Sequence, residues 1–147
     1  MTESSGAINF FHEDVEAPLE DYSQTKDWLF QSVIQEGNRI GEINVIFCDD
    51  DYLLKLNQDH LEHNYFTDIL TFQYSETPIS GDLFISTSRV KENASTHDVS
   101  FKTELRRVII HGVLHLLGYK DKSPKEIKVM REKEDEYLDG WDLLMGC

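Results

Sequence analysis

The pattern that most constrains the fold of this chain is an apolar, helical one between Ser100 and Gly118. Apolar residues within 101–117 recur at three- and four-residue spacing, which places them on one side of a helix. Ser100 is a residue type favoured just before a helix, and Gly118 accepts the left-handed backbone with which helices commonly end. The sequence therefore predicts one long helix here, which needs an apolar surface to pack against.

Two histidines, His111 and His115, stand four positions apart within this predicted helix. Because a helix turns by about 100° per residue, both imidazoles lie on one face. Gly118 then reverses the chain and can bring Asp121 back toward them. Two imidazoles and one carboxylate supply three corners of a tetrahedral zinc site, and an open fourth corner is typical of catalytic zinc. The pattern HxxxHxxGxxD predicts one Zn²⁺ per chain at these residues; the alternative is a packed histidine pair on a buried helix.

The residue after the first histidine bears on the type of zinc chemistry. The arrangement is metzincin-like, but zinc peptidases of the HExxH type carry a glutamate there as general base. This chain has Gly112, so peptide hydrolysis by the usual route lacks its base. A glycine inside a helix costs about 1 kcal/mol relative to alanine. We therefore expect another backbone, or the substrate, to approach the helix closely at Gly112.

The remaining patterns predict a single α+β domain over residues 1–147, because no repeat or linker divides the chain. The expected element order is β-α-β-α-β-β-α-α-α, giving about five helices on a mixed four-stranded sheet. Alternating and β-branched segments predict the strands 7–11, 42–48, 69–74 and 81–86. Helical spacing predicts helices at 26–36, from the aspartates 49–51 to about 61, at 87–92, at 101–117 and at 124–138.

Residue types also predict how several helices begin and end. Thr25 is expected to cap the first helix, and Asp49–Asp51 to cap the second rather than to bind a metal ion. Ser123 and Glu126 have the spacing of a capping box, with a proline at the first helical position between them. Gly140 is expected to end the last helix.

Other potential ligands and active-site groups are given structural interpretations. Glu104 precedes His111 by two helical turns, about 10.5 Å, so the two cannot share an ion on one helix. We expect Glu104 to be solvated, and a structural role or one supporting the metal ligands is the alternative. Asp82, beside a glycine, is interpreted as the residue that ends a turn. The remaining histidines have no neighbour at ligand spacing and are expected at the surface: His12, His60, His63 and His97.

The net charge of −14 argues against a nucleic-acid partner, but the charge is unevenly distributed. Residues 1–68 hold 15 acidic and 3 basic residues, whereas residues 101–131 hold 8 basic and 3 acidic ones. The basic residues flank the predicted metal site, and Lys120 and Lys122 are candidates to contact RNA phosphate; two solvated basic helix faces are the alternative. The chain has no apolar run of about 20 residues, no secretory pattern and no CxxC pair, so we expect a cytoplasmic protein without membrane contact.

Several segments together resemble the YbeY-type endoribonucleases, which are ribosomal RNA maturation factors. HGVLHLLGY at 111–119 resembles the signature HGxLHLxGYDH, TDILTF at 67–72 resembles TDVLSF, and GDLFIS at 81–86 resembles GDIxIS. The similarity runs from about residue 40 to the end. Two positions differ: the third histidine ligand of the family falls on Asp121, which remains a good zinc ligand, and an arginine of the family falls on Leu61.

The resemblance implies an α+β fold with the ligand helix against the sheet. It also implies a zinc-dependent endoribonuclease specific for single strands, acting in 16S rRNA 3′-end maturation and ribosome quality control. The implied partners are ribosomal RNA and the ribosome or ribosomal proteins. Two alternatives are a zinc peptidase or amidohydrolase, which Gly112 disfavours, and a non-catalytic ribosome assembly factor, which Leu61 and the acidic composition favour. The residues identify no general acid or base.

Overall fold

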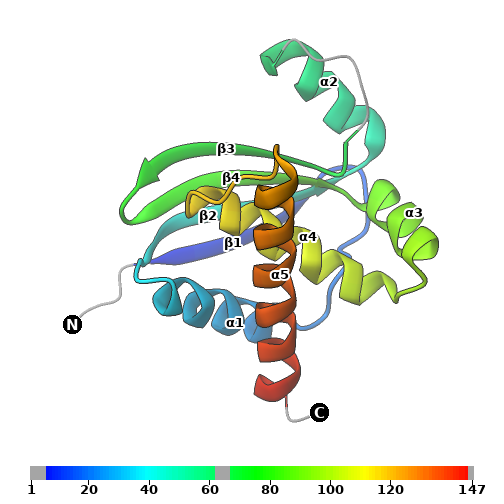
Figure 1. The fold of residues 1–147 in the computed structure, drawn as a ribbon. Helices are drawn as coiled ribbons and strands as arrows, with labels where there is room; N and C mark the ends of the chain where they lie inside the picture. The colour runs from blue at the N-terminus through cyan, green and yellow to red at the C-terminus, as the bar shows by residue number, and fades with distance from the viewer. Residues whose placement is uncertain (1–5, 62–66, 146–147) are drawn as a thin grey trace.

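The computed structural model describes residues 6–61 and 67–145, which form helices on a four-stranded sheet (Figure 1). In chain order the elements are β1 (Ala7–His12), α1 (Tyr22–Gln35), β2 (Ile40–Cys48), α2 (Asp50–Leu61), β3 (Ile69–Glu76), β4 (Ile79–Ser86), α3 (Thr87–His97), α4 (Phe101–Leu116) and α5 (Pro124–Leu144). The strand order is β1-β2-β4-β3, with β3 antiparallel to β4 and the other pairs parallel. The predicted fold class and element order are thereby confirmed.

The main core lies between the sheet and the helices α1, α4 and α5, which Figure 1 shows on one side of the sheet. Alternate residues of the two central strands point toward these helices, as the period of a strand requires. They are fully buried: Ile43, Val45, Phe47, Leu83 and Ile85. The buried residues that α4 contributes to the same core include three spaced by four: Leu105, Ile109 and Val113. The central helix thus sits directly on the sheet, as its apolar pattern predicted.

Gly112 marks the place where α4 comes closest to the sheet. A Cβ atom at this position would lie 2.7 Å from Cδ1 of Ile69 and 3.1 Å from both methyl carbons of Leu83. The close neighbours are therefore side chains of β3 and β4, and the expectation of a nearby backbone or substrate was wrong. The missing side chain at Gly112 lets the helix carrying both histidines lie against the strands.

The other face of the sheet carries a polar ladder that crosses all four strands. Asn9 donates to Asn44 at 3.0 Å, Asn44 donates to Asp82 at 3.1 Å, and the Tyr74 hydroxyl donates to Asp82 at 2.7 Å. Asp82 therefore lies within β4 and bridges two strands, and its interpretation as the end of a turn was wrong. At one end of this face, α2 packs Leu53 against the sheet in a second, smaller apolar cluster.

Three of the predicted helix caps are present. The Ser100 hydroxyl accepts the backbone N–H of Thr103 at 3.1 Å, at the start of α4. Asp49 accepts the backbone N–H of Tyr52 at 2.8 Å and so caps α2. At α5 both hydrogen bonds of the capping box form between Ser123 and Glu126. Each cap satisfies N–H groups that have no partner within the helix.

Three predicted helix boundaries were wrong. The helix expected at 87–92 continues to His97 as α3. The first helix begins before Thr25, and the hydroxyl of Thr25 donates to the carbonyl oxygen of Asp21 at 2.9 Å inside the first turn. The last helix continues through Gly140 to Leu144. Trp141 is buried there and packs edge-on against Trp28, with ring centroids 5.5 Å apart. This contact outweighs the local preference of glycine to end a helix. None of the helices in the described parts of the chain is long and apolar enough to cross a membrane.

Candidate metal centre

The end of α4 and the turn after it bring His111, His115 and Asp121 together. Gly118 has a φ of +106°, which glycine adopts without strain. Its N–H donates to the His115 carbonyl at 3.0 Å, and the N–H of Tyr119 donates to the Leu114 carbonyl at 3.0 Å, which closes the helix. The chain then reverses, as the sequence predicted, and the Asp121 carboxylate returns to the histidine face.

The three side chains present their donor atoms to one another at the corners of a nearly equilateral triangle. The Nε2 atoms of His111 and His115 are 3.1 Å apart, and Oδ2 of Asp121 lies 3.2 Å from the first and 3.3 Å from the second. In a tetrahedral zinc site with bonds of about 2.0–2.1 Å, ligand atoms lie about 3.3–3.4 Å apart. The spacing and the donor types therefore fit a divalent transition-metal ion, with one face of the triangle left for a further ligand.

A buried carboxylate on α5 orients the first histidine. Oε2 of Glu134 lies 2.6 Å from Nδ1 of His111, and Oε1 accepts from Arg107 at 2.9 Å. An ionised carboxylate can only accept, so Nδ1 carries the proton, and the neutral ring then presents the lone pair of Nε2 to His115 and Asp121. Metal-binding histidines commonly have such a partner, which sets the tautomer and raises the basicity of the ligand.

In the pair formed by His111 and Glu134, burial and charge shift each pKa in opposite directions. Burial lowers the pKa of His111, but the hydrogen bond and the charge of Glu134 outweigh it, so the pKa lies above its ordinary value. Burial likewise raises the pKa of Glu134, and hydrogen bonds from His111 and Arg107 bring it below its ordinary value. A cation bound at the Nε2 side would compete with the second proton on His111.

Sequence reasoning missed Glu134, although a signal for it exists. On α5 the buried residues Met130, Tyr137 and Trp141 follow helical spacing, and Glu134 occupies the position between them. An acidic residue within the apolar stripe of a helix requires a buried partner. Because exposed acidic residues such as Asp135 surround Glu134 in the sequence, Glu134 was not distinguished from them.

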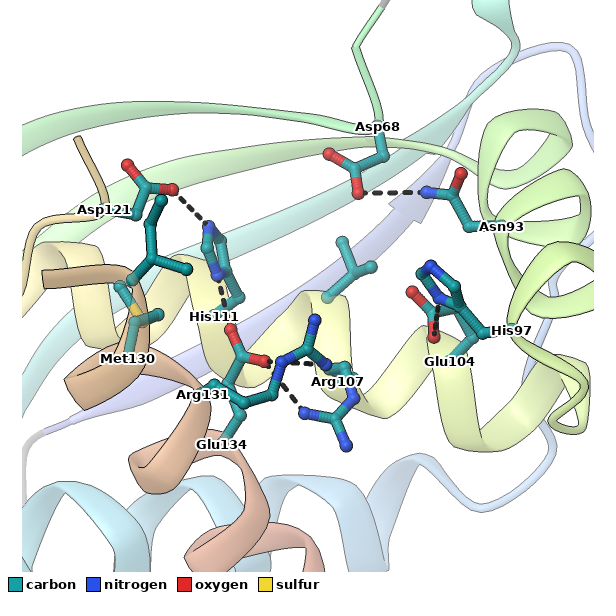
Figure 2. Close-up of a pocket in the computed structure, with 12 residues that line it drawn as sticks. Asp68, Asn93, His97, Glu104, Arg107, His111, Asp121, Met130, Arg131 and Glu134 are labelled. Atoms are coloured by element: carbon teal, nitrogen blue, oxygen red, sulfur yellow. Dashed lines mark hydrogen bonds and ion pairs between the residues drawn. The ribbon is translucent and has the colours of Figure 1, made fainter. Parts of the chain in front are cut away.

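A cleft of about 310 Å³ opens beside the triad, and it is bounded by α4, α5, α3 and the residue before β3 (Figure 2). Asp68 and Asn93 stand on the wall opposite His111, and His97 and Glu104 stand farther along (Figure 2). Glu104 is only 4% exposed, with an oxygen 3.8 Å from Nδ1 of His97. The expectation that Glu104 is solvated was therefore wrong.

The lysines predicted to contact RNA lie outside this cleft. Lys120 and Lys122 are exposed, and Lys120 lines a separate hollow that His115 also lines. The basic side chains that line the cleft are Arg107 and Arg131. Arg107 is held by Glu134 and by Asp135, whereas the half-exposed Arg131 approaches Glu134 only to 3.7 Å.

Other sequence predictions have mixed outcomes. His12 and His97 are exposed, as expected, and His60 is exposed but lies in the last turn of α2 rather than in a loop. His63 and the side chain of Leu61 lie outside the part of the chain that the structure describes.

Comparison with known proteins shows similarity over nearly the whole chain. The family model described as "Endoribonuclease YbeY" matches residues 7–142. A protein of that name from Flavobacterium johnsoniae is 48% identical over 132 residues, covering 89% of this chain and 94% of its own. A namesake from Cytophaga hutchinsonii is 49% identical over 133 residues, covering 89% and 93%. A solution structure of a Thermotoga maritima protein is 30% identical with a TM-score of 0.64, covering 92% of this chain and 89% of its own.

Proposed function

The chain belongs to the YbeY family of endoribonucleases, and from this premise we propose that it hydrolyses phosphodiester bonds of single-stranded RNA at a zinc site. The proposed ligands are His111, His115 and Asp121. The observation that carries this proposal is the convergence of their three donor atoms at 3.1–3.3 Å, beside an open cleft. The carboxylate at position 121 serves where the family signature has a histidine.

The residues around the site have separable roles in the proposed reaction. Zn²⁺, when bound, supplies Lewis acidity to a phosphoryl oxygen and lowers the pKa of water to about 7. Glu134 holds the His111 ring so that its Nε2 faces the ion. Arg131, half-exposed at the cleft, is placed to meet a backbone phosphate, and the exposed Lys120 and Lys122 contact RNA beyond the cleft.

The proposed substrate is ribosomal RNA near the 16S 3′ end, with a further role in ribosome quality control in the cytoplasm. The similarity to the YbeY relatives supports this part of the proposal. The charge of −14 is consistent with a need for a partner, because the global field opposes RNA binding and makes it weak and salt-sensitive. We propose that the ribosome or a ribosomal protein holds the enzyme at its substrate.

Two other functions remain as outcomes of the test. A zinc peptidase needs a general base after the first histidine, and Gly112 instead packs against Ile69 and Leu83. A non-catalytic assembly factor would bind metal and ribosomal RNA without cleaving it.

The test uses purified protein loaded with one equivalent of Zn²⁺ and a fluorescent single-stranded RNA. We expect cleavage that a chelator abolishes and added zinc restores, with a double-stranded RNA resistant. The variant His115→Ala is expected to lose bound zinc, measured by elemental analysis, together with activity. His60→Ala removes an exposed histidine of α2 and serves as the matched control. Full zinc occupancy in His115→Ala would overturn the ligand assignment, and activity remaining in that variant would reveal a contaminating nuclease.

A further inference from the structure

We propose that Asp68 is the general base of this site and takes the proton from the water that attacks phosphorus in the cleft. This inference rests on the proposed ribonuclease function and adds a residue to its machinery. Asp68 is brought to the site by a segment that is far from α4 in the sequence. Its placement, its partners and its environment each support the role.

The structure fixes the position of Asp68 through contacts with two other elements. Its backbone carbonyl accepts the N–H of Ser86, at the end of β4, at 2.9 Å. One carboxylate oxygen accepts from the side chain of Asn93 on α3 at 3.3 Å. The carboxylate is thereby directed into the cleft from the wall opposite His111 and Asp121, as Figure 2 shows. A general base must be held in a fixed position beside its proton donor, and these contacts hold the Asp68 carboxylate at the wall of the cleft.

The other carboxylates that line the cleft are already engaged. Glu134 accepts from His111 and Arg107, and Asp121 belongs to the triad. Glu104 is buried near His97. Within residues 6–61 and 67–145, Asp68 is the cleft carboxylate that forms no ion pair.

The surroundings of Asp68 also shift its pKa in the direction that favours a base. Burial raises the pKa of Asp68 above its ordinary value, although the charge of His111 and backbone N–H donors oppose the change. The other charged groups that act on it are Glu134 from α5 and Arg89 from α3. A base is more effective when its pKa lies closer to the working pH, provided that it remains ionised there.

The proposed step is a hydrolysis in which no group is oxidised or reduced. An O–H bond of water breaks as its proton passes to the Asp68 carboxylate, and the water oxygen forms a bond to phosphorus. The bond between phosphorus and the leaving ribose oxygen breaks, and this oxygen takes a proton from solvent. Asp68 then returns its proton to the solvent that enters the open cleft.

The test compares Asp68→Asn and Asp68→Glu with the wild type, all loaded with zinc. Asparagine keeps the shape and the ability to accept from Asn93 but removes the basicity. We expect kcat at pH 7 to fall by about 10²–10⁴-fold in Asp68→Asn, with KM nearly unchanged and part of the loss restored in Asp68→Glu. With zinc kept in saturating excess at every pH, the acidic limb of the kcat–pH profile is expected to disappear in Asp68→Asn. Glu92→Gln, which alters an exposed carboxylate of α3 outside the cleft, is the matched control.

Two measurements separate this role from a structural one. Zinc affinity and the melting temperature are expected to stay near the wild-type values in Asp68→Asn, and a loss of bound zinc would overturn the role of base. An RNA with a single 2′-deoxyribose at the cleaved position is expected to be cut, because water is the nucleophile. Resistance of that RNA would instead assign the attack to the neighbouring 2′-hydroxyl and overturn the proposed step.

The outcomes also distinguish this inference from the proposed function. Suppose that the wild type cleaves RNA in a zinc-dependent way and that the kcat of Asp68→Asn stays within about threefold of the wild-type value. The role of Asp68 then fails and the ribonuclease function stands. If the zinc-loaded wild type does not cleave RNA, the proposed function fails, and the role of Asp68 fails with it.

Discussion

Replacing Glu134 with glutamine tests whether this carboxylate prepares His111 to bind the ion, and it changes none of the three proposed ligands. In the wild type the carboxylate accepts from Nδ1 of His111 at 2.6 Å and from Arg107 at 2.9 Å, and Glu134 is 4% exposed. A glutamine has one acceptor and one donor at the same two places. If its oxygen faces His111, its NH₂ group points at the guanidinium of Arg107. If the amide is reversed, Nδ1 must accept, and the proton moves to Nε2, where the ion would bind.

The expected magnitude follows from this conflict. Loss of a carboxylate that supports a metal-binding histidine lowers metal affinity by about 10–100-fold, which corresponds to about 1.4–2.7 kcal/mol. The metal-free protein also loses a charge-assisted hydrogen bond in a buried place, which destabilises it by about 1.5–3 kcal/mol. For a chain of this length, that loss lowers Tm by roughly 4–10 °C.

Zinc affinity is measured by competition with a chromophoric chelator, and stability by thermal unfolding with and without zinc. Asp135→Asn is the matched control, because Asp135 accepts from the same Arg107 at 2.8 Å but is 55% exposed at its side chain and does not contact His111. We expect that control to bind zinc within about twofold of the wild type. A Glu134→Gln protein that binds zinc as tightly as the wild type would refute the idea that this carboxylate prepares His111 for the ion.

Three further predictions concern Glu36, Gly81 and His111. Glu36→Ala removes a carboxylate that accepts from Tyr137 and two other donors, so we expect a loss of about 1–3 kcal/mol in urea unfolding at pH 7. The hydrogen bonds to Glu36 outweigh burial and lower its pKa in the folded protein, so its stabilising effect is lost as pH falls through that folded pKa. If Glu36→Ala lost as much unfolding free energy at pH 3 as at pH 7, this explanation would be contradicted. Gly81→Ala places a Cβ 2.5 Å from the Phe72 carbonyl oxygen, so Tm should fall by an amount equivalent to about 1–3 kcal/mol; an unchanged Tm would be inconsistent with this contact. Because the pKa of His111 is raised, zinc affinity should weaken as pH falls from 8 to 5.5, beginning above the ordinary imidazole pKa, and a flat profile would count against His111 as a ligand.

The order of elements and the juxtaposition of His111, His115 and Asp121 could be predicted because both depend on residues that are close in sequence. Strand alternation and helical spacing are read within single segments, and the structure confirmed all of the predicted elements. His111 and His115 lie one helical turn apart and the reversal at Gly118 returns Asp121 to them, so local geometry brings the three together. Their role as ligands stays a prediction, but their juxtaposition did not require knowledge of the rest of the fold.

The walls of the cleft, in contrast, were decided by tertiary structure. Glu134 is 23 residues from His111 in sequence, and Asp68 comes from the segment before β3. Whether an acidic side chain is solvated or buried depends on the partner that packing brings to it, and no local pattern specifies that partner. The same reason explains the buried Glu104 and the continuation of α5 past Gly140, where the contact of Trp141 with Trp28 outweighs local preference. Local geometry thus brought His111, His115 and Asp121 together, and long-range packing determined the charged groups that surround them.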